Sequence, residues 1–382
     1  MRLRKRRRNQ VSGWRAIRRC VVFFTAVCVI PVLLVLLVAT DHYMRPVQHT
    51  TFLRPQFDES DRILSDSMQY SHNLTMVGMR MEKRRRHLKK SCHNLGLDRN
   101  GNDTLHRPNP WEFLVDKKHH LVWCNVFKAA STSWMYNFNI LAGYKPKFLK
   151  KSKLVPMTLA RQKYPRPSLQ GLKEAFNNSV SFVIVRHPLE RLLSAYRDKL
   201  QFALPHTHHQ KLGNEIVAKY RNKLRNKEHR GKPQQRWPTF PEFVEYLVDS
   251  VKSGERLDMH WTPITEFCTP CMFDFQMIAH TETLQEDQTY LIKKAKLEHL
   301  IEPQWKNAGK GTTSGQITKY YSQLTRSQIL HLYHIYRYDF ELFNYSLSGF
   351  LELGQQDKDP STLLAAITLK DFQRLPLPQV YK

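Results

Sequence analysis

The chain has 382 residues, of which 60 are Lys or Arg and 33 are Asp or Glu, and its net charge is +27. A charge of this size makes a neutral substrate a poor match and attracts polyanions. The polyanion would be a nucleic acid in the cytosol or nucleus and an acidic glycan behind a membrane, so the compartment decides between them.

The N-terminus indicates a membrane anchor. The first twenty residues carry nine Lys or Arg and no acid, and residues 21–39 are apolar apart from Thr25. A run of this length can cross a bilayer as a helix, and its basic flank stays cytoplasmic. We expect a cytoplasmic tail over residues 1–20, a signal-anchor helix over 21–39 and a lumenal remainder. A cleaved signal peptide is the alternative, which the long basic region and long apolar run disfavour.

Sequons and cysteines agree with a secretory lumen. Four Asn-x-Ser/Thr sequons are present, at Asn73, Asn102, Asn177 and Asn344. Four cysteines lie beyond the apolar run, at Cys92, Cys124, Cys268 and Cys271. An even number suits two disulfides. Of the three pairings we expect Cys268–Cys271 with Cys92–Cys124.

The net charge of the expected lumenal part indicates the class of partner that it binds. Nine positive charges lie in the first twenty residues, which leaves +18 for the remainder. We therefore expect an acidic glycan as partner and no nucleic acid. For a single basic cluster, such as residues 83–86, a solvated surface is the alternative.

Composition divides the lumenal part into three. Residues 40–90 lack a sustained apolar period and are expected to form a stem, with a basic helix at 79–90. Residues 91–350 carry regular apolar segments and should form one α/β domain, a central parallel sheet flanked by helices. Residues 351–382 form a tail to which the sequence assigns no role.

Apolar runs and periodicity predict the elements of this domain. Strands are expected at residues 121–126, 182–186 and 273–280. Helices are expected at residues 132–141, 189–202, 241–250, 284–296 and 327–342. The histidine-rich region 206–237 should form helices or loops over an acceptor groove.

Residues 119–138 read as an apolar strand, a polar turn and a helix. The turn, residues 127–131, is followed by Thr132 and Ser133 at the start of the helix. Backbone N–H groups at such a junction bind phosphate oxygens. Lys128 can neutralise the charge that develops on a leaving phosphate oxygen. An ordinary strand–helix junction with a surface lysine is the alternative.

Residues 181–200 repeat this pattern. Arg186 ends an apolar strand, where open α/β sheets bind ligands, and Ser194 lies on the following helix. An arginine fork suits a phosphate. Arg191 and Arg197 are expected to form ion pairs with Glu190 and Asp198. Two phosphate sites on one sheet suit 3′-phosphoadenylyl sulfate, which carries phosphate at both its 5′ and 3′ ends.

The two segments resemble the 5′- and 3′-phosphosulfate motifs of the Golgi carbohydrate sulfotransferases. The branch with chondroitin, dermatan and GalNAc 4-O-sulfotransferases and a glucuronyl 3-O-sulfotransferase reads PKVACTNW and VREPFERLVSAYRNK, where this chain has FKAASTSW and VRHPLERLLSAYRDK. The segments HW…CTPC…ETLQED and YDFELFNYS resemble two further blocks of that branch. Three residues depart from the pattern: Phe127 replaces Pro, Ser131 replaces Cys and His187 replaces Glu.

The resemblance implies a P-loop-like sulfotransferase domain that transfers sulfuryl from 3′-phosphoadenylyl sulfate to a glycan hydroxyl, with GalNAc O-4 of chondroitin-type chains as the expected acceptor. It places the 5′-phosphosulfate on Phe127, Lys128, Ala129, Ala130, Ser131, Thr132 and Ser133. It places the 3′-phosphate on Arg186, His187, Pro188, Leu189, Glu190, Arg191, Leu192, Leu193 and Ser194, with Arg186 and Ser194 as principal ligands. No metal is expected, because Lys and Arg supply the positive charge.

No motif names the base that takes the acceptor proton. His260 is the first candidate because a neutral imidazole accepts a proton near neutral pH; a structural His packed on Trp261 is the alternative. His187 and Glu190 are weaker candidates. Trp237 and Trp261 could stack on sugar rings or pack in the core.

Other functions remain open from the sequence. They are a sulfotransferase acting on heparan sulfate, terminal glucuronate or an N-glycan GalNAc, and a non-catalytic binder of acidic glycans. A zinc site from the C-x-x-C pair with His206, His208 and His209 is disfavoured in an oxidising lumen. A nucleotide kinase is disfavoured, because the chain lacks the G-x-x-x-x-G-K-[ST] signature of such enzymes.

Overall fold

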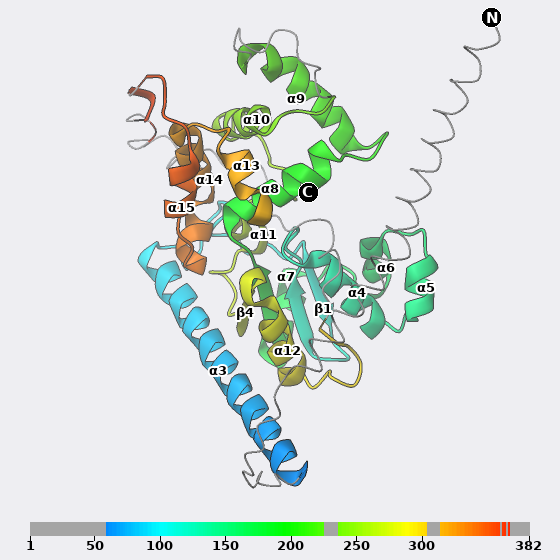
Figure 1. Cartoon of the computed structure of the whole chain (residues 1–382). Coiled ribbons are helices and arrows are strands. Elements are labelled where there is room, and N and C mark those ends of the chain that lie inside the picture. Colours follow the sequence, from blue (N-terminus) through cyan, green and yellow to red (C-terminus); the bar gives the residue numbers. More distant parts are fainter. Residues whose placement is uncertain (1–58, 225–235, 304–313, 360, 364–365, 367–382) are drawn as a thin grey trace, which may run out of the picture. The chain divides into compact units, whose positions relative to one another are not determined.

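The computed structural model describes residues 59–224, 236–303, 314–359, 361–363 and 366. Its centre is a sheet of four strands in the order β1-β2-β3-β4 (Figure 1). The strands are β1 (Phe113–Asp116), β2 (Leu121–Cys124), β3 (Val180–Val185) and β4 (Met277–His280). Those expected at residues 121–126 and 182–186 are confirmed, and the third is shorter than expected.

Strands β2, β3 and β4 are parallel, as expected, but β1 is not. It pairs antiparallel with β2, Phe113 opposite Cys124, while Leu121 of β2 pairs with Val180 of β3. No strand was predicted at β1, because a four-residue strand offers little alternation to recognise. Since parallel strands end at one edge, the segments that follow β2, β3 and β4 meet there.

Helices connect and cover the sheet. Those that the sequence predicted are confirmed as α4 (Ser131–Leu141), α8 (Pro188–Tyr196) continued by η2 (Arg197–Gln201), α10 (Phe240–Lys252), α12 (Leu284–Lys294) and α14 (Arg326–Phe343). The others are α3 (Glu59–Asn94), α5 (Pro146–Lys151), α6 (Pro156–Lys163), α7 (Leu169–Asn178), α9 (His208–Leu224), α11 (Ile264–Cys268), α13 (Ile317–Tyr321) and α15 (Ser348–Leu353). Single turns lie at η4 (Thr281–Thr283) and η5 (Ser314–Gln316).

Local sequence explains where two of these helices begin. Thr239 caps α10 and Glu242 bonds back to it, and Thr325 and Gln328 form the same reciprocal pair at α14. Each pair satisfies two backbone donors that a helix end leaves without a partner. These helices carry apolar faces into a core at the ends of the strands.

Buried side chains form two hydrophobic clusters. The first surrounds the sheet with α3, α4 and α12. The second joins α8, α10 and α14 and is rich in aromatic residues. Figure 1 shows α8–α10 and α13–α15 gathered at one end of the sheet, with α4–α7 and α12 beside the strands. Helix α8 follows β3 and belongs to the second cluster, so it links the two.

Helix α3 changes the expected boundary between stem and domain. Residues 79–90 are helical as expected, but they are part of a longer helix whose buried side chains pack in the sheet's core: Val77, Met81, Leu88 and Cys92. The compact unit that contains the sheet begins at Asp66. The second half of the expected stem is therefore part of the folded domain.

Ion pairs hold α3 in place. Arg80 and Arg84 each approach the fully buried Asp287 of α12 to 2.7 Å. Arg85 and Lys89 pair with Asp274, which lies just before β4. Arg84 and Arg85, in the middle of the basic cluster at 83–86, are therefore bound to acids of the same chain rather than free to bind a polyanion.

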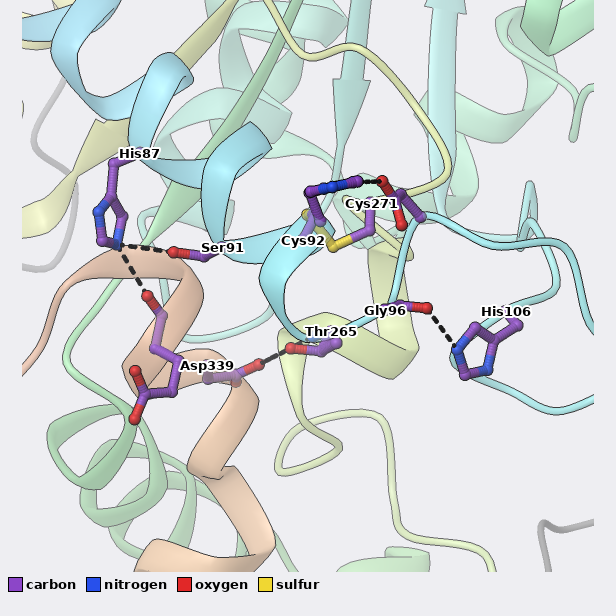
Figure 2. The surroundings of a disulfide bond; sticks show 11 residues. His87, Ser91, Cys92, Gly96, His106, Thr265, Cys271 and Asp339 are labelled. Atoms are coloured by element: carbon purple, nitrogen blue, oxygen red, sulfur yellow. Dashed lines mark hydrogen bonds and ion pairs between the residues drawn. A yellow bond between two sulfur atoms is a disulfide. The ribbon is translucent and has the colours of Figure 1, made fainter.

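The disulfides pair differently from our expectation. Cys92 bonds to Cys271 and Cys124 to Cys268. Cys268 ends α11 inside the core, beside the end of β2. The chain then turns at Thr269, whose φ of 39° is left-handed, and Cys271 faces the end of α3 (Figure 2). Both bridges therefore join segments that are more than a hundred residues apart.

We expect peptide mapping of the unreduced protein to recover Cys92–Cys271 and Cys124–Cys268. Replacing Cys124 and Cys268 together by alanine should lower the free energy of unfolding by about 2–5 kcal/mol, because the unfolded chain regains the freedom of a long loop. Chemical denaturation measures this loss. A Cys268–Cys271 peptide would contradict the pairing.

Among the described residues, no helix is both long and apolar enough to span a bilayer. The segments 1–20 and 21–39 lie outside those residues. The four sequon asparagines are exposed. At the other end, part of the tail packs on the domain, since the backbone oxygen of the buried Ala366 contacts His334 Nε2 at 2.7 Å.

Candidate functional site

The turn after β2 leaves backbone N–H groups open at the start of α4. Lys128 and Ala130 both have positive φ, 67° and 57°. Such angles are uncommon outside glycine, and such strain tends to collect at ligand sites. Ala130 offers no side-chain cap to α4, and the N–H groups of Ser131 and Thr132 have no acceptor within the described chain. These donors are available to an anion.

The side chain of Lys128, within this turn, has one acidic partner among the described residues. Its Nζ is 3.2 Å from Oδ2 of Asp198, which Lys199 also contacts at 3.2 Å. Burial lowers the pKa of Lys128, and Asp198 opposes that shift. The amine is therefore a cation that gives up its proton more easily than an exposed lysine does.

Arg186 brings the two turns together. Its Nη2 donates to Glu190 at 3.1 Å and its Nη1 to the backbone oxygen of Lys128 at 3.5 Å. Both turns lie at the carboxyl edge of adjacent parallel strands. The sequence placed Lys128 and Arg186 in one site, and the structure has them in contact.

The remaining residues of the two motifs divide by exposure. Thr132 is exposed, and Phe127, Ala130, Ser131, Glu190 and Ser194 are partly exposed. The buried residues pack in the interior behind the turns; they are Ala129, Ser133, Pro188, Leu189, Arg191, Leu192 and Leu193. Direct contact with a bound molecule is therefore open mainly to the first group.

His187 faces the aromatic residues of the C-terminal segment. Its ring stacks on Phe350 with centroids 4.5 Å apart, and its Nε2 contacts the backbone oxygen of Ser346 at 3.0 Å. Its backbone N–H donates to Glu282 at 3.0 Å. Burial lowers the pKa of His187. An acidic side chain, Glu282, therefore accepts from the N–H group that precedes α8.

The expected ion pairs of Arg191 and Arg197 are wrong. Arg191 is 1% exposed and donates to the backbone oxygens of His260 and Thr262. Asp198 pairs with Lys128 and Lys199 instead of Arg197. The sequence could not show this, because the carbonyls that Arg191 binds lie about seventy residues away.

His260 lies against the first turn. Its ring is 4.7 Å from that of Phe127, and its Nδ1 is 2.6 Å from Asp258 Oδ1. Burial lowers the pKa of His260, against the pull of Asp258. The imidazole is therefore neutral at neutral pH and has a nitrogen that can accept a proton.

Asp258 was not predicted at this site, and His209 was considered only as a disfavoured zinc ligand. Asp258 also accepts from His209 Nε2 of α9, at 3.1 Å. Ligand atoms of His209, Asp258 and His260 lie within 4.8 Å of one another, a spacing at which a metal ion can be held. Ligands around tetrahedral zinc lie about 3.3 Å apart. The 2.6 Å contact of Asp258 with His260 is shorter than this and fits a direct hydrogen bond between the two side chains.

The two tryptophans considered for sugar stacking differ. Trp261 is fully buried and packs edge-to-face on Phe243, 5.3 Å between centroids. It is a core residue, and stacking on a sugar is excluded for it. Trp237 is partly exposed, and its backbone oxygen accepts from Arg221 at 2.9 Å.

Comparison with known proteins decides the family. Residues 111–346 match the family model described as "Sulfotransferase family". This chain belongs to the sulfotransferase family. It is an O-sulfotransferase that acts on carbohydrate, and membership implies 3′-phosphoadenylyl sulfate as the sulfuryl donor.

The relatives are carbohydrate sulfotransferases. The enzyme is 31% identical over 254 residues to carbohydrate sulfotransferase 10 of Xenopus laevis, covering 62% of this chain and 68% of the relative. It is 27% identical over 251 residues to carbohydrate sulfotransferase 11 of Rattus norvegicus, covering 64% and 70%. Carbohydrate sulfotransferase 9 of Homo sapiens is 29% identical over 273 residues, covering 69% and 60%. No solved structure matches.

Three acids of the sulfotransferase motifs have structural partners. Asp287 of ETLQED binds α3. Asp339 of YDFELF accepts from the N–H groups of Ile264 and Thr265 and from the Thr265 hydroxyl, and so caps α11 (Figure 2). Glu282 accepts from His187 and from the Tyr345 hydroxyl. These contacts fix the loops that surround the site.

Proposed function

We propose that this enzyme transfers sulfuryl from 3′-phosphoadenylyl sulfate to O-4 of GalNAc in chondroitin- or dermatan-type chains. The acceptor rests on the resemblance of four motif blocks to the branch that holds the 4-O-sulfotransferases. One observation supports the site: Arg186 and the ring of His260 both contact the turn that follows β2 and carries Lys128.

The donor would lie across the two turns. The open N–H groups of Ser131 and Thr132, with Lys128, suit the 5′-phosphosulfate. Arg186 and Ser194 suit the 3′-phosphate. Glu190 already accepts from Arg186 at 3.1 Å, so it holds the guanidinium toward the site and leaves other N–H groups for phosphate.

The reaction is an in-line displacement at sulfur. The acceptor oxygen forms a bond to sulfur as the bond from sulfur to the 5′-phosphate oxygen breaks. The acceptor proton passes to Nε2 of His260, and the charge left on the phosphate is stabilised by Lys128. The lowered pKa of Lys128 favours proton sharing with that oxygen. Lys and Arg supply the positive charge, so the proposal includes no metal ion.

We place the enzyme in the Golgi membrane as a single-pass type II protein, with its catalytic domain in the lumen. Two disulfides and four exposed sequon asparagines suit an oxidising, glycosylating compartment. The anchor is the apolar segment at 21–39. Protease protection of sealed vesicles tests the orientation, and digestion of the domain without detergent would contradict it.

The acceptor is tested with a panel of glycans. The full-length enzyme is incubated with labelled donor and desulfated chondroitin, dermatan, heparan sulfate, a terminal glucuronate and an N-glycan GalNAc. Disaccharide analysis then maps the sulfate. We expect GalNAc 4-sulfate from the first two. Sulfation of another acceptor alone would assign a different substrate, and salt-sensitive glycan binding without transfer would favour a non-catalytic binder.

Replacing His260 by alanine should lower kcat about 100-fold or more, because general-base catalysis contributes roughly 10²–10⁴. Binding of adenosine 3′,5′-bisphosphate, measured by calorimetry, should be unchanged. In the parent enzyme, kcat/KM should fall on the acid side with a midpoint below 6.5, since burial lowers the pKa of His260 from that value. The variant should no longer show this acid-side fall of kcat/KM. Retained activity with the same acid-side fall would exclude His260 as the base.

A further inference from the structure

The carboxylate of Asp258 joins two histidines from distant parts of the chain. Oδ1 is 2.6 Å from His260 Nδ1 and Oδ2 is 3.1 Å from His209 Nε2. His209 is on α9 and Asp258 precedes α11. No motif of the family resemblance includes His209, and the sequence alone assigns no role to Asp258.

These contacts determine which nitrogens carry protons. Burial acts to raise the pKa of Asp258, but the hydrogen bonds from His209 and His260 outweigh it and hold that pKa well below its usual range. An ionised carboxylate only accepts hydrogen bonds. His260 must therefore donate from Nδ1, which leaves its Nε2 as the unprotonated nitrogen.

Further contacts restrict the position of His260. Its backbone N–H also donates to Asp258 Oδ1, at 2.9 Å, and its backbone oxygen accepts from the buried Arg191. Its ring packs between Phe127, at 4.7 Å, and His209, at 5.1 Å. Within the described chain, Nε2 of His260 has no hydrogen-bond partner, and this atom is accessible rather than buried.

We propose that Asp258 and His209 are positioning residues: Asp258 fixes the His260 tautomer that presents Nε2 to the acceptor hydroxyl, and His209 fixes Asp258. This rests on the proposed role of His260 as base. A base whose tautomer is set in advance need not exchange protons between its nitrogens before each turnover. The bond from His209 also ties α9 to the loop that carries the base.

The test combines kinetics with a direct measurement of the tautomer. In Asp258→Asn we expect kcat to fall about 100-fold or more, as tautomer loss does in other histidine-dependent enzymes, with KM for the glycan within twofold. Asp258→Glu keeps a carboxylate and should recover part of kcat. His209→Gln keeps Asp258 bonded to His260 and should lose about tenfold.

The tautomer is read from ¹⁵N shifts of the full-length enzyme labelled at histidine, with His260 assigned by comparison with His260→Gln. We expect the parent to carry its proton on Nδ1 and Asp258→Asn to shift toward Nε2–H. His208→Ala, an exposed neighbour on α9, is the control and should retain parental kcat. An unchanged kcat or an unchanged tautomer in Asp258→Asn would overturn the proposal.

The two hypotheses fail in different ways. If His260→Ala keeps full activity, the role of His260 as base is wrong, whatever the tautomer spectrum shows. If His260→Ala is inactive and Asp258→Asn is not impaired, the base stands and the positioning role is wrong. Adenosine 3′,5′-bisphosphate binding, measured for every variant, shows that each has folded.

Discussion

Lys128→Ala is expected to lower kcat for sulfuryl transfer by about 100- to 1,000-fold. Removing one preplaced donor from a developing charge costs about this much in other transferases and hydrolases. Lys128 is mostly buried, and among the described residues it contacts one acid, Asp198, at 3.2 Å. The charge on the leaving phosphate grows as the bond to sulfur breaks, so the loss should appear in kcat more than in donor affinity.

Lys199→Ala is the matched control. Lys199 carries the same charge and contacts the same carboxylate at the same distance of 3.2 Å, but it follows Asp198 in η2 and is not part of the turn. We expect its kcat to stay within about threefold of the parent. Equal losses of kcat in both variants would assign the effect to the overall positive electrostatic potential rather than to the position of Lys128. An unchanged kcat in Lys128→Ala would exclude this lysine from the mechanism.

The second large effect concerns stability and lies far from the site. Arg84→Ala should lower the free energy of unfolding by about 3 kcal/mol, because it leaves the buried Asp287 with one arginine instead of two. Arg84 also donates to the backbone oxygen of Ile278 in β4, at 3.1 Å. The variant should melt several degrees below the parent.

Arg86→Ala is the control for this experiment. Arg86 is on the same helix, its side chain is 74% exposed, and within the described segments its one ion pair is with Glu82, at 3.7 Å. A surface pair of this kind contributes less than about 1 kcal/mol. Similar melting temperatures for the two variants would show that α3 is not held by Asp287. A chain begun at residue 91, the boundary expected from sequence, should fail to fold.

The sequence predicted that the turns of Lys128 and Arg186 lie together. The apolar strands before these turns have local signals, and adjacent parallel strands bring their carboxyl ends to one edge. The contact of Arg186 with the backbone oxygen of Lys128 agrees with this.

The contact between His209 and Asp258 had no such signal. His209 and Asp258 are forty-nine positions apart, and only the tertiary fold brings them together. Disulfide connectivity likewise cannot be deduced from the spacing of cysteines in the sequence. Helix α3 did leave a trace, since its buried residues at 77, 81, 88 and 92 recur at helical spacing. The many arginines between them obscured that pattern.

The bridge between Cys124 and Cys268 limits how the enzyme can admit a polymer. Cys124 is three positions before Phe127, and Cys268 is eight after His260. A covalent link this near both segments restricts how far the turn of Lys128 and the loop of His260 can move apart. A motion that admits the proposed glycan acceptor must therefore come mainly from elements outside this bridge.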